Sequence, residues 1–279
     1  MFERLSRELC FISHVKLVSV LFGGLFLAGC AASVVPLSDR IRLINRDAYV
    51  QGTVWQEGTV QTDGLQLAVV RRASAGGYGK ALRIYMEGDG HAYISRGMVS
   101  GDPTPLNPVG LELALADEGG GEVVYLGRPC QWVRGPECTD RSLWTTGRFT
   151  ERMARAYAEI VAQESGGRPV ELIGYSGGAW VALQVAARLD NVVGVTTVAG
   201  NLAPDYVNAH HKVARIEVAP YPQGRLAELP VTAYIGTKDR IVPRGTVEDY
   251  RRQTAARNLT VKEVPASHGE GWKPLFGRI

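Results

Sequence analysis

The sequence predicts an α/β fold in which helices cover both faces of a mostly parallel central sheet. Short apolar runs recur along the chain, and segments with apolar residues at helical spacing alternate with them. The composition, 45% hydrophobic and 21% charged, is that of an ordinary globular enzyme. A length of 279 residues fits one domain of this class with a sizeable core.

Seven apolar runs bounded by polar or turn-forming residues predict the strands of the sheet. They are Gln66 to Arg71, Leu82 to Met86, Glu122 to Leu126, Val170 to Ile173, Val192 to Val198, Val231 to Ile235 and Leu259 to Val264. Phe149 to Gln163 and Ala179 to Leu189 carry Ala, Leu, Val and Met at helical spacing, which predicts helices packed against that sheet.

The charge pattern excludes some partners. Formal net charge is +3, and the basic residues are scattered along the chain, so we expect no nucleic-acid partner. The sequence shows no glycine-rich phosphate-binding fingerprint, and we expect neither an organic cofactor nor a metal.

The segment before residue 30 is typical of a secretion signal. Leu17 to Gly29 is uncharged and mostly apolar, follows Lys16, and is shorter than the roughly 20 residues that a spanning helix needs. We therefore expect residues 1–29 to be a signal peptide, residues 30–50 a linker, and residues 51–279 the folded domain.

Leu27-Ala28-Gly29-Cys30 resembles the lipobox of bacterial lipoproteins. The resemblance implies that Cys30 is lipidated and becomes the mature N-terminus. It also implies, with Ala31 in place of Asp, a periplasmic protein whose lipid anchor lies in the outer membrane. The alternative is an ordinary cleavage site followed by an incidental cysteine.

Two cysteines remain in the expected mature domain, Cys130 and Cys138. An oxidising periplasm would let them pair, and their spacing lacks the C-x-x-C pattern of a zinc site. We expect a disulfide that closes a loop, with two free thiols as the alternative.

Gly174-Tyr175-Ser176-Gly177-Gly178 matches the pattern G-x-S-x-G and lies between a predicted strand and a predicted helix. That setting is what a nucleophile elbow requires, because the turn is so tight that the residues two before and two after the serine must be small. The motif predicts Ser176 as a nucleophile. A helix-capping serine is the alternative.

A serine hydroxyl needs a positioned base, and in this strand–turn–helix class the chain order is nucleophile, acid, histidine. His268 follows the last predicted strand and is the candidate base, whereas His91, His210 and His211 lie elsewhere. Asp239, just after the strand ending at Ile235, is the candidate acid that would orient the imidazole. Asp205 is the runner-up.

The reaction also needs donors for the negative charge that develops on the substrate oxygen. One candidate is the N–H of Gly177, directly after the nucleophile. The second is the N–H of Asp89 or Gly90, in the loop after the strand ending at Met86. Glu87 stands there where HGGG-type sequences carry His. A plain β-turn is the alternative for this loop.

Taken together, these motifs resemble those of α/β-hydrolase lipoproteins of proteobacteria over most of residues 66–272. The stretches that carry the resemblance are YMEGDGHAY, YLGRPC, GYSGG, VAGN, GTKDRIVP and SHGEGW. The resemblance implies the α/β-hydrolase fold and a Ser-His-Asp triad, and it supplies no substrate.

We therefore expect a serine hydrolase that cleaves an ester or related acyl bond of a small-molecule substrate through an acyl-enzyme. A peptidase or thioesterase would use the same machinery. A non-catalytic envelope lipoprotein that uses the fold as a binding scaffold is the alternative from another class. The connection from Asn201 to Leu229 is too short for a large cap domain, so we expect a site covered by loops, among them the one closed by Cys130 and Cys138.

Overall fold

A computed structural model of the chain describes residues 35–48, 54–73, 80–95 and 97–275. The predicted signal peptide, Cys30 and the start of the predicted linker lie outside these residues. All of the described residues belong to one compact unit.

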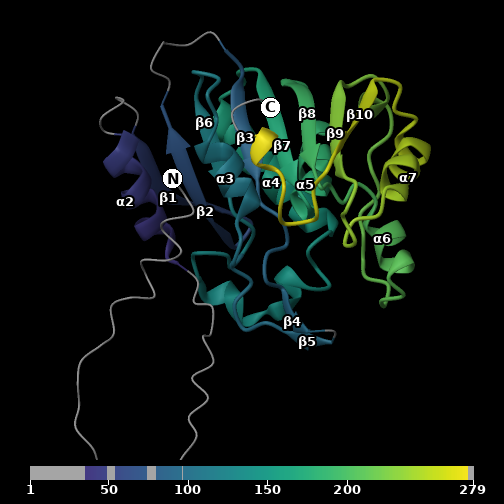
Figure 1. Cartoon of the computed structure of the whole chain (residues 1–279), viewed down its shortest axis with the longest axis horizontal. Coiled ribbons are helices and arrows are strands. Elements are labelled where there is room, and N and C mark those ends of the chain that lie inside the picture. The colour runs from purple at the N-terminus through teal and green to yellow at the C-terminus, as the bar shows by residue number, and fades with distance from the viewer. Residues whose placement is uncertain (1–34, 49–53, 74–79, 96, 276–279) are drawn as a thin grey trace, which may run out of the picture. The chain divides into compact units, whose positions relative to one another are not determined.

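The centre of this unit is an eight-stranded sheet with the order β1-β2-β6-β3-β7-β8-β9-β10 (Figure 1). β2 pairs antiparallel with both neighbours, and all other pairs in the sheet are parallel. The strands are β1 (Trp55–Thr62), β2 (Leu65–Arg72), β3 (Leu82–Met86), β6 (Val123–Leu126), β7 (Val170–Tyr175), β8 (Val192–Val198), β9 (Val231–Gly236) and β10 (Leu259–Val264). This confirms the predicted fold class, and the seven predicted strands are present within one or two residues.

Helices pack on both faces of the sheet, as predicted. They are α2 (Leu37–Ala48), α3 (Val109–Leu115), α4 (Glu151–Ser165), α5 (Gly177–Ala186), α6 (Pro204–His210) and α7 (Gly245–Thr254). A small hairpin of β4 (Tyr93–Ser95) and β5 (Met98–Val99) follows β3. Short 3-10 turns cover Pro136–Thr139, Arg141–Trp144, Arg225–Ala227 and Lys273–Leu275.

Most buried side chains of the strands belong to two hydrophobic cores, and Ala233 and Ile235 of β9 form a third, smaller cluster with Val247. In β2, Leu67 and Val69 belong to the core beneath α4 and α5, whereas Ala68 and Val70 belong to the core that includes α2 and α3. This alternation follows from the two-residue period of a strand. Because both faces are covered, the central strands consist almost entirely of buried apolar residues.

Two N-terminal elements differ from the sequence prediction. Part of the expected linker is the helix α2, whose Leu37 and Ile41 are one helical turn apart and buried in the second core. The edge strand β1 was not predicted, because only Trp55 and Thr62 are buried and its other residues do not alternate as apolar and polar. An edge strand with one partner does not need an apolar run.

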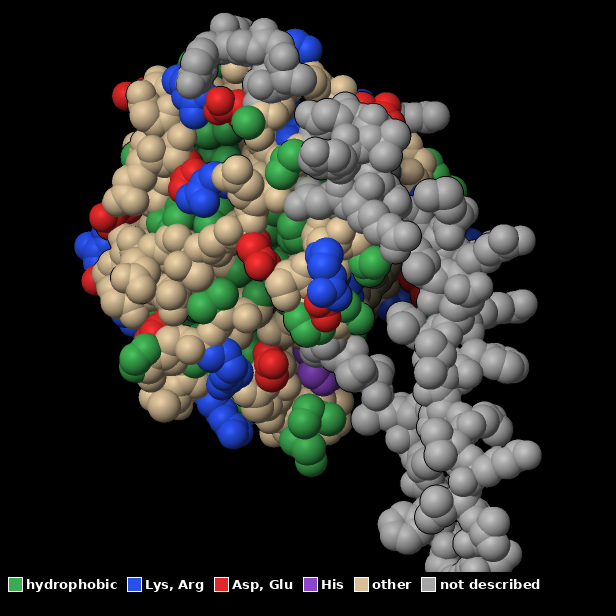
Figure 2. Space-filling view, turned by 90° about the vertical axis from the view of Figure 1, so that its left-hand side faces the viewer, with side chains coloured by type: hydrophobic (Ala, Val, Ile, Leu, Met, Phe, Trp, Pro, Cys, Tyr) green, Lys and Arg blue, Asp and Glu red, His purple; other side chains and the backbone are tan. Residues whose placement is uncertain are grey.

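The surface matches the scattered charge of the sequence. On the described part of the face seen in Figure 2, Lys and Arg side chains are interspersed with Asp and Glu, and neither sign forms a continuous patch. Among the described residues, no helix has the length and apolar character needed to cross a membrane.

Candidate active site

Ser176 occupies the sharp turn between β7 and α5. Its φ of 48° and ψ of −121° are unusual for a residue with a side chain. A Cβ atom on Gly174 would lie 2.5 Å from the Cα atom of Ala179, and one on Gly178 would collide with the carbonyl oxygen of Met86. Glycine is therefore required on both sides of the turn, as the motif predicted.

Ser176, His268 and Asp239 form one chain of hydrogen bonds. Ser176 Oγ lies 2.9 Å from His268 Nε2, and His268 Nδ1 lies 2.9 Å from Asp239 Oδ2. The three residues follow β7, β10 and β9, which are parallel neighbours or near neighbours in the sheet. Their carboxyl ends therefore bring the side chains to one edge of the sheet.

Asp239 is held as a carboxylate that can accept from the imidazole. Its side chain is 2% exposed, and its Oδ1 accepts from the backbone N–H groups of Ile241 at 2.8 Å and Val242 at 3.0 Å. Burial tends to raise the pKa of Asp239, but the hydrogen bond and charge of His268, together with these N–H groups, lower it below the ordinary value.

The loop that carries His268 is fixed by its backbone. The carbonyl oxygen of His268 accepts from Tyr175 Oη at 3.0 Å and from Trp272 Nε1 at 2.9 Å. Asn107 Nδ2 donates to the carbonyl oxygen of the next residue, Gly269, at 2.6 Å. The imidazole is therefore oriented by Asp239 on one side and by its own anchored loop on the other.

The other histidines and the runner-up acid do not join this chain. Asp205 is exposed in the first turn of α6, and His210 and His211 lie at the end of that helix. His211 Nε2 contacts the carbonyl oxygen of Ile241 at 2.7 Å. His91 follows β3, and its N–H donates to the carbonyl oxygen of Pro103.

The structure also brings Gly177 and Asp89 together. A Cβ atom on Gly177 would collide with the carboxylate of Asp89, so the loop after β3 packs directly on the elbow. The N–H of Gly88 donates to Glu87 Oε1 at 2.9 Å. Within the described residues, the N–H groups of Gly177, Asp89 and Gly90 donate to no protein acceptor. These three N–H groups are therefore free to donate a hydrogen bond to a substrate oxygen.

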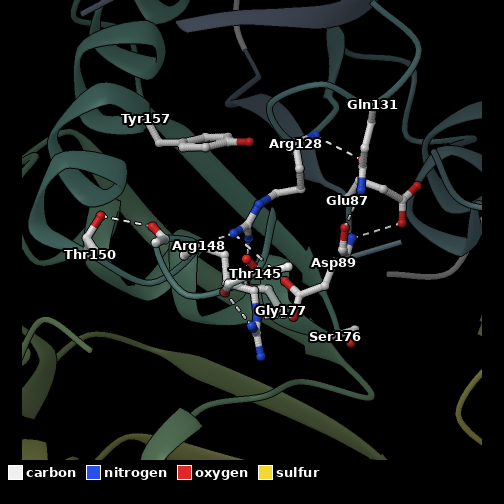
Figure 3. Close-up of polar contacts among 12 residues, drawn as sticks. Glu87, Asp89, Arg128, Gln131, Thr145, Arg148, Thr150, Tyr157, Ser176 and Gly177 are labelled. Carbon is white, nitrogen blue, oxygen red and sulfur yellow. Dashed lines mark hydrogen bonds and ion pairs between the residues drawn. The ribbon is translucent and has the colours of Figure 1, made fainter. Parts of the chain in front are cut away.

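Three buried polar side chains lie at this loop, and the sequence did not predict their roles: Glu87, Arg128 and Gln131 (Figure 3). Glu87 is 1% exposed and accepts from the N–H groups of Gly88, Gly110 and Leu111 and from Tyr125 Oη. Burial raises the pKa of Glu87, and these four donors oppose part of that effect.

Arg128 and Gln131 come from the loop after β6. Arg128 belongs to the motif RPC and Gln131 directly follows it, but they lie 49 and 43 positions from Gly177 and Gly88, the residues of the elbow and the loop that they contact. No local pattern predicts such contacts.

The predicted disulfide between Cys130 and Cys138 is present and encloses part of the loop after β6. No group of three or more His, Cys, Asp or Glu side chains that could hold a metal ion occurs in the described part of the chain.

Comparison with solved structures gives the fold. An esterase of Pyrococcus furiosus, Pf2001, has a TM-score of 0.51 and 14% identity, covering 81% of this chain and 89% of its own. A cold-adapted esterase from an Arctic intertidal metagenomic library has a TM-score of 0.50 and 15% identity, covering 80% and 89%. No family model and no curated protein matches the chain. The sheet order and these neighbours show that the chain has the α/β-hydrolase fold and is similar to hydrolases.

Proposed function

We propose that this protein is a serine hydrolase that cleaves an ester or a related acyl bond of a small molecule. The observation that carries the proposal is the hydrogen-bonded chain of Ser176, His268 and Asp239, with Ser176 on a strained elbow at the carboxyl edge of the sheet. The esterases with a similar fold support a hydrolase in general and do not identify the bond.

In this proposal, Ser176 Oγ attacks the acyl carbonyl while His268 Nε2 takes its proton. Asp239 keeps the imidazole in the tautomer with Nδ1 protonated and stabilises the imidazolium that forms. His268 then gives the proton to the leaving alcohol, which leaves an acyl group on Ser176. Water, activated by the same histidine, attacks this acyl-enzyme and regenerates the serine.

The negative oxygen of each tetrahedral intermediate would be stabilised by two backbone N–H groups. Gly177 supplies the first, from the start of α5. For the second we favour Asp89 over Gly90, because the Cβ position of Gly90 points at Pro103 and Gln131. A Cβ atom on Gly88, by contrast, would lie 3.0 Å from Ser176 Cβ, which places the peptide between Gly88 and Asp89 beside the nucleophile.

The decisive experiment treats the folded protein with a fluorophosphonate probe. We expect labelling of the wild type, loss of labelling in Ser176→Ala, and full labelling in Ser95→Ala, a control at an exposed serine on β4. An unlabelled but folded wild type would reject the hydrolase and favour a binding scaffold. A panel of acyl esters, thioesters and amides of increasing chain length would then separate an esterase from a thioesterase or a peptidase.

Export and lipidation belong to the proposal as well, on the resemblance of the segment that ends at Cys30 to a lipobox. We expect incorporation of labelled palmitate in cells that express the wild type, and none in Cys30→Ser. Palmitate in neither protein would indicate an ordinary cleavage site.

A further inference from the structure

We infer that Gln131 is a positioning residue that orients the Asp89 N–H toward the substrate oxygen. This inference rests on the proposed function, because it concerns the oxyanion hole of that reaction. Gln131 is 0% exposed, and its side chain joins the loop after β6 to the loop after β3 (Figure 3).

The argument begins with the planarity of the peptide bond. The Asp89 N–H belongs to the same trans peptide as the Gly88 carbonyl, so the two groups point in opposite directions. Gln131 Nε2 donates to the Gly88 carbonyl oxygen at 2.9 Å. Holding that carbonyl therefore fixes the direction of the Asp89 N–H.

The first donor is held in the same way. The Gly177 N–H shares a peptide with the Ser176 carbonyl, whose oxygen accepts from the N–H of Asn201 at 2.9 Å and of Ala179 at 3.1 Å. A backbone group supplies this support next to the nucleophile. For the second donor, the matching support comes from a side chain, and Gln131 has the role that the Asn201 N–H has for Gly177.

Only one orientation of the Gln131 amide satisfies its surroundings. Its Oε1 accepts from the backbone N–H of Arg128 at 3.0 Å, and its Nε2 faces the Gly88 carbonyl. Exchanging the two atoms would bring donor to donor and acceptor to acceptor. The amide is therefore locked, which is what a positioning group needs.

The neighbouring arginines hold the side chain of Asp89 in place. Arg148 Nε donates to Asp89 Oδ2 at 3.0 Å, and Arg128 Nη2 lies 3.8 Å from Asp89 Oδ1. Arg128, whose side chain is 4% exposed, also donates to the Gly177 carbonyl at 3.3 Å and to the Arg148 carbonyl at 2.7 Å. The positive charges of Arg128 and Arg148 thus offset the negative charge of the Asp89 carboxylate. Without them, this carboxylate would repel a negative substrate oxygen beside Gly177.

The loop that carries Gln131 has an unfavourable backbone that needs support. Cys130 and Trp132, on either side of Gln131, have φ values of 66° and 67°, in the region that favours glycine. The Cys130–Cys138 disulfide and the hydrogen bond from the Trp132 N–H to Thr104 Oγ1 at 2.9 Å hold this segment. The disulfide therefore stabilises the loop that orients the second donor.

The test is Gln131→Glu, which keeps the size of the side chain and the acceptor for the Arg128 N–H, but removes the donor to Gly88 once the new carboxyl group is ionised. We expect kcat to fall about 100-fold, the effect of losing one oxyanion donor, with KM changed less than twofold. The affinity for a boronic acid, whose adduct places an oxygen in the hole, should fall by a similar factor. Rates are taken per fluorophosphonate-titrated site, so that only folded protein is counted.

A pH series separates positioning from general damage. When the introduced carboxyl group is protonated it can again donate to Gly88, so the ratio of variant to wild-type kcat should rise as the pH falls. Gln131→Met, which lacks any donor, should show the same loss with a ratio that does not change with pH. Gln163→Glu, the same change on the exposed surface of α4, should leave kcat and the boronic acid affinity unchanged.

An unchanged kcat and boronic acid affinity in Gln131→Glu, together with a labelled wild type, would overturn the inference and leave the proposed function intact. An equal loss with a pH-independent ratio in both Gln131 variants would also overturn it. A wild type that neither labels nor turns over esters would instead reject the proposed function.

Discussion

Two buried carboxyl groups at opposite ends of β3 are compensated in different ways. Asp117, at the edge where β3 begins, is paired with Arg72 and Arg83 and accepts from Tyr85 Oη at 2.6 Å. Glu87, directly after β3 at the edge that carries Ser176, accepts from three backbone N–H groups and one tyrosine hydroxyl, and no Lys, Arg or His among the described residues forms an ion pair with it.

The difference in their partners indicates different roles: Asp117 stabilises the fold, and Glu87 positions the loop of the candidate site. Asp117 joins β2 and β3 by pairing with an arginine from each strand, and its removal would take away the buried carboxylate that the two arginines share. Glu87 instead fixes the directions of individual N–H groups, one of them in the peptide just before the proposed oxyanion donor. Replacing each acid by its amide tests this distinction with matched changes.

The largest effect on stability is expected for Asp117→Asn. Arg72 and Arg83 would lose the buried carboxylate that they share, although Arg83 also pairs with Glu171 at 3.4 Å, and this loss costs about 3–5 kcal/mol of unfolding free energy. Urea unfolding measures the loss. The ester hydrolysis rate per titrated site should stay within twofold of wild type, because Asp117 lies at the other edge of the sheet. A loss below about 1 kcal/mol would mean that the cluster of Asp117, Arg72 and Arg83 contributes little to holding β2 and β3 together.

Glu87→Gln should cost less stability but more activity. The new amide nitrogen would face backbone donors and leave one of them unsatisfied, which costs about 1–3 kcal/mol. Because the loop before Asp89 would shift, we expect kcat to fall about 10- to 100-fold. Urea unfolding and ester hydrolysis measure the two effects. Normal turnover in a destabilised variant would show that Glu87 serves the fold as Asp117 does.

The cost of Glu87→Gln should also depend on pH. Burial raises the pKa of Glu87 in the folded protein above the ordinary value of 4.5. The stability that this carboxyl group contributes is therefore fully present below pH 4.5 and is lost as the pH rises through the folded-state pKa. The gap in unfolding free energy between wild type and variant should shrink from pH 4.5 to pH 8. A difference in unfolding free energy that grows over this range would mean that the pKa of Glu87 is lowered, not raised, in the folded protein.

The smallest effect is expected for Asp63→Asn, a surface control. Asp63 Oδ2 pairs with Arg152 Nε at 3.1 Å, and both side chains are about half exposed. Asn also tolerates the φ of 46° at this position. Such a pair is worth about 0–1 kcal/mol, so urea unfolding should show a change below about 1 kcal/mol, with turnover unchanged. A larger loss of unfolding free energy would mean that an exposed acid contributes as much to stability as the buried acids Asp117 and Glu87.

The residues that sequence reasoning reached are those whose role is encoded locally. Ser176 was found because its small neighbours lie between a strand and a helix, and Asp239 and His268 because each follows a strand of a parallel sheet. Gln131 and Arg128 gain their roles only through contacts more than 40 positions away along the chain. The strand β1 is not predicted for a different reason, because it buries only two of its side chains and so leaves a weak pattern.

The proposed nucleophile and the proposed second oxyanion donor depend on different parts of the fold. Ser176, Asp239 and His268 follow strands of the sheet, whereas the loop that holds Gln131 is closed by Cys130 and Cys138, neither of which belongs to a strand. Under the proposed function, molecules in which this disulfide has not formed would keep the sheet but turn over substrate more slowly. Specific activity, rather than yield or circular dichroism, would then measure how many molecules carry the closed loop.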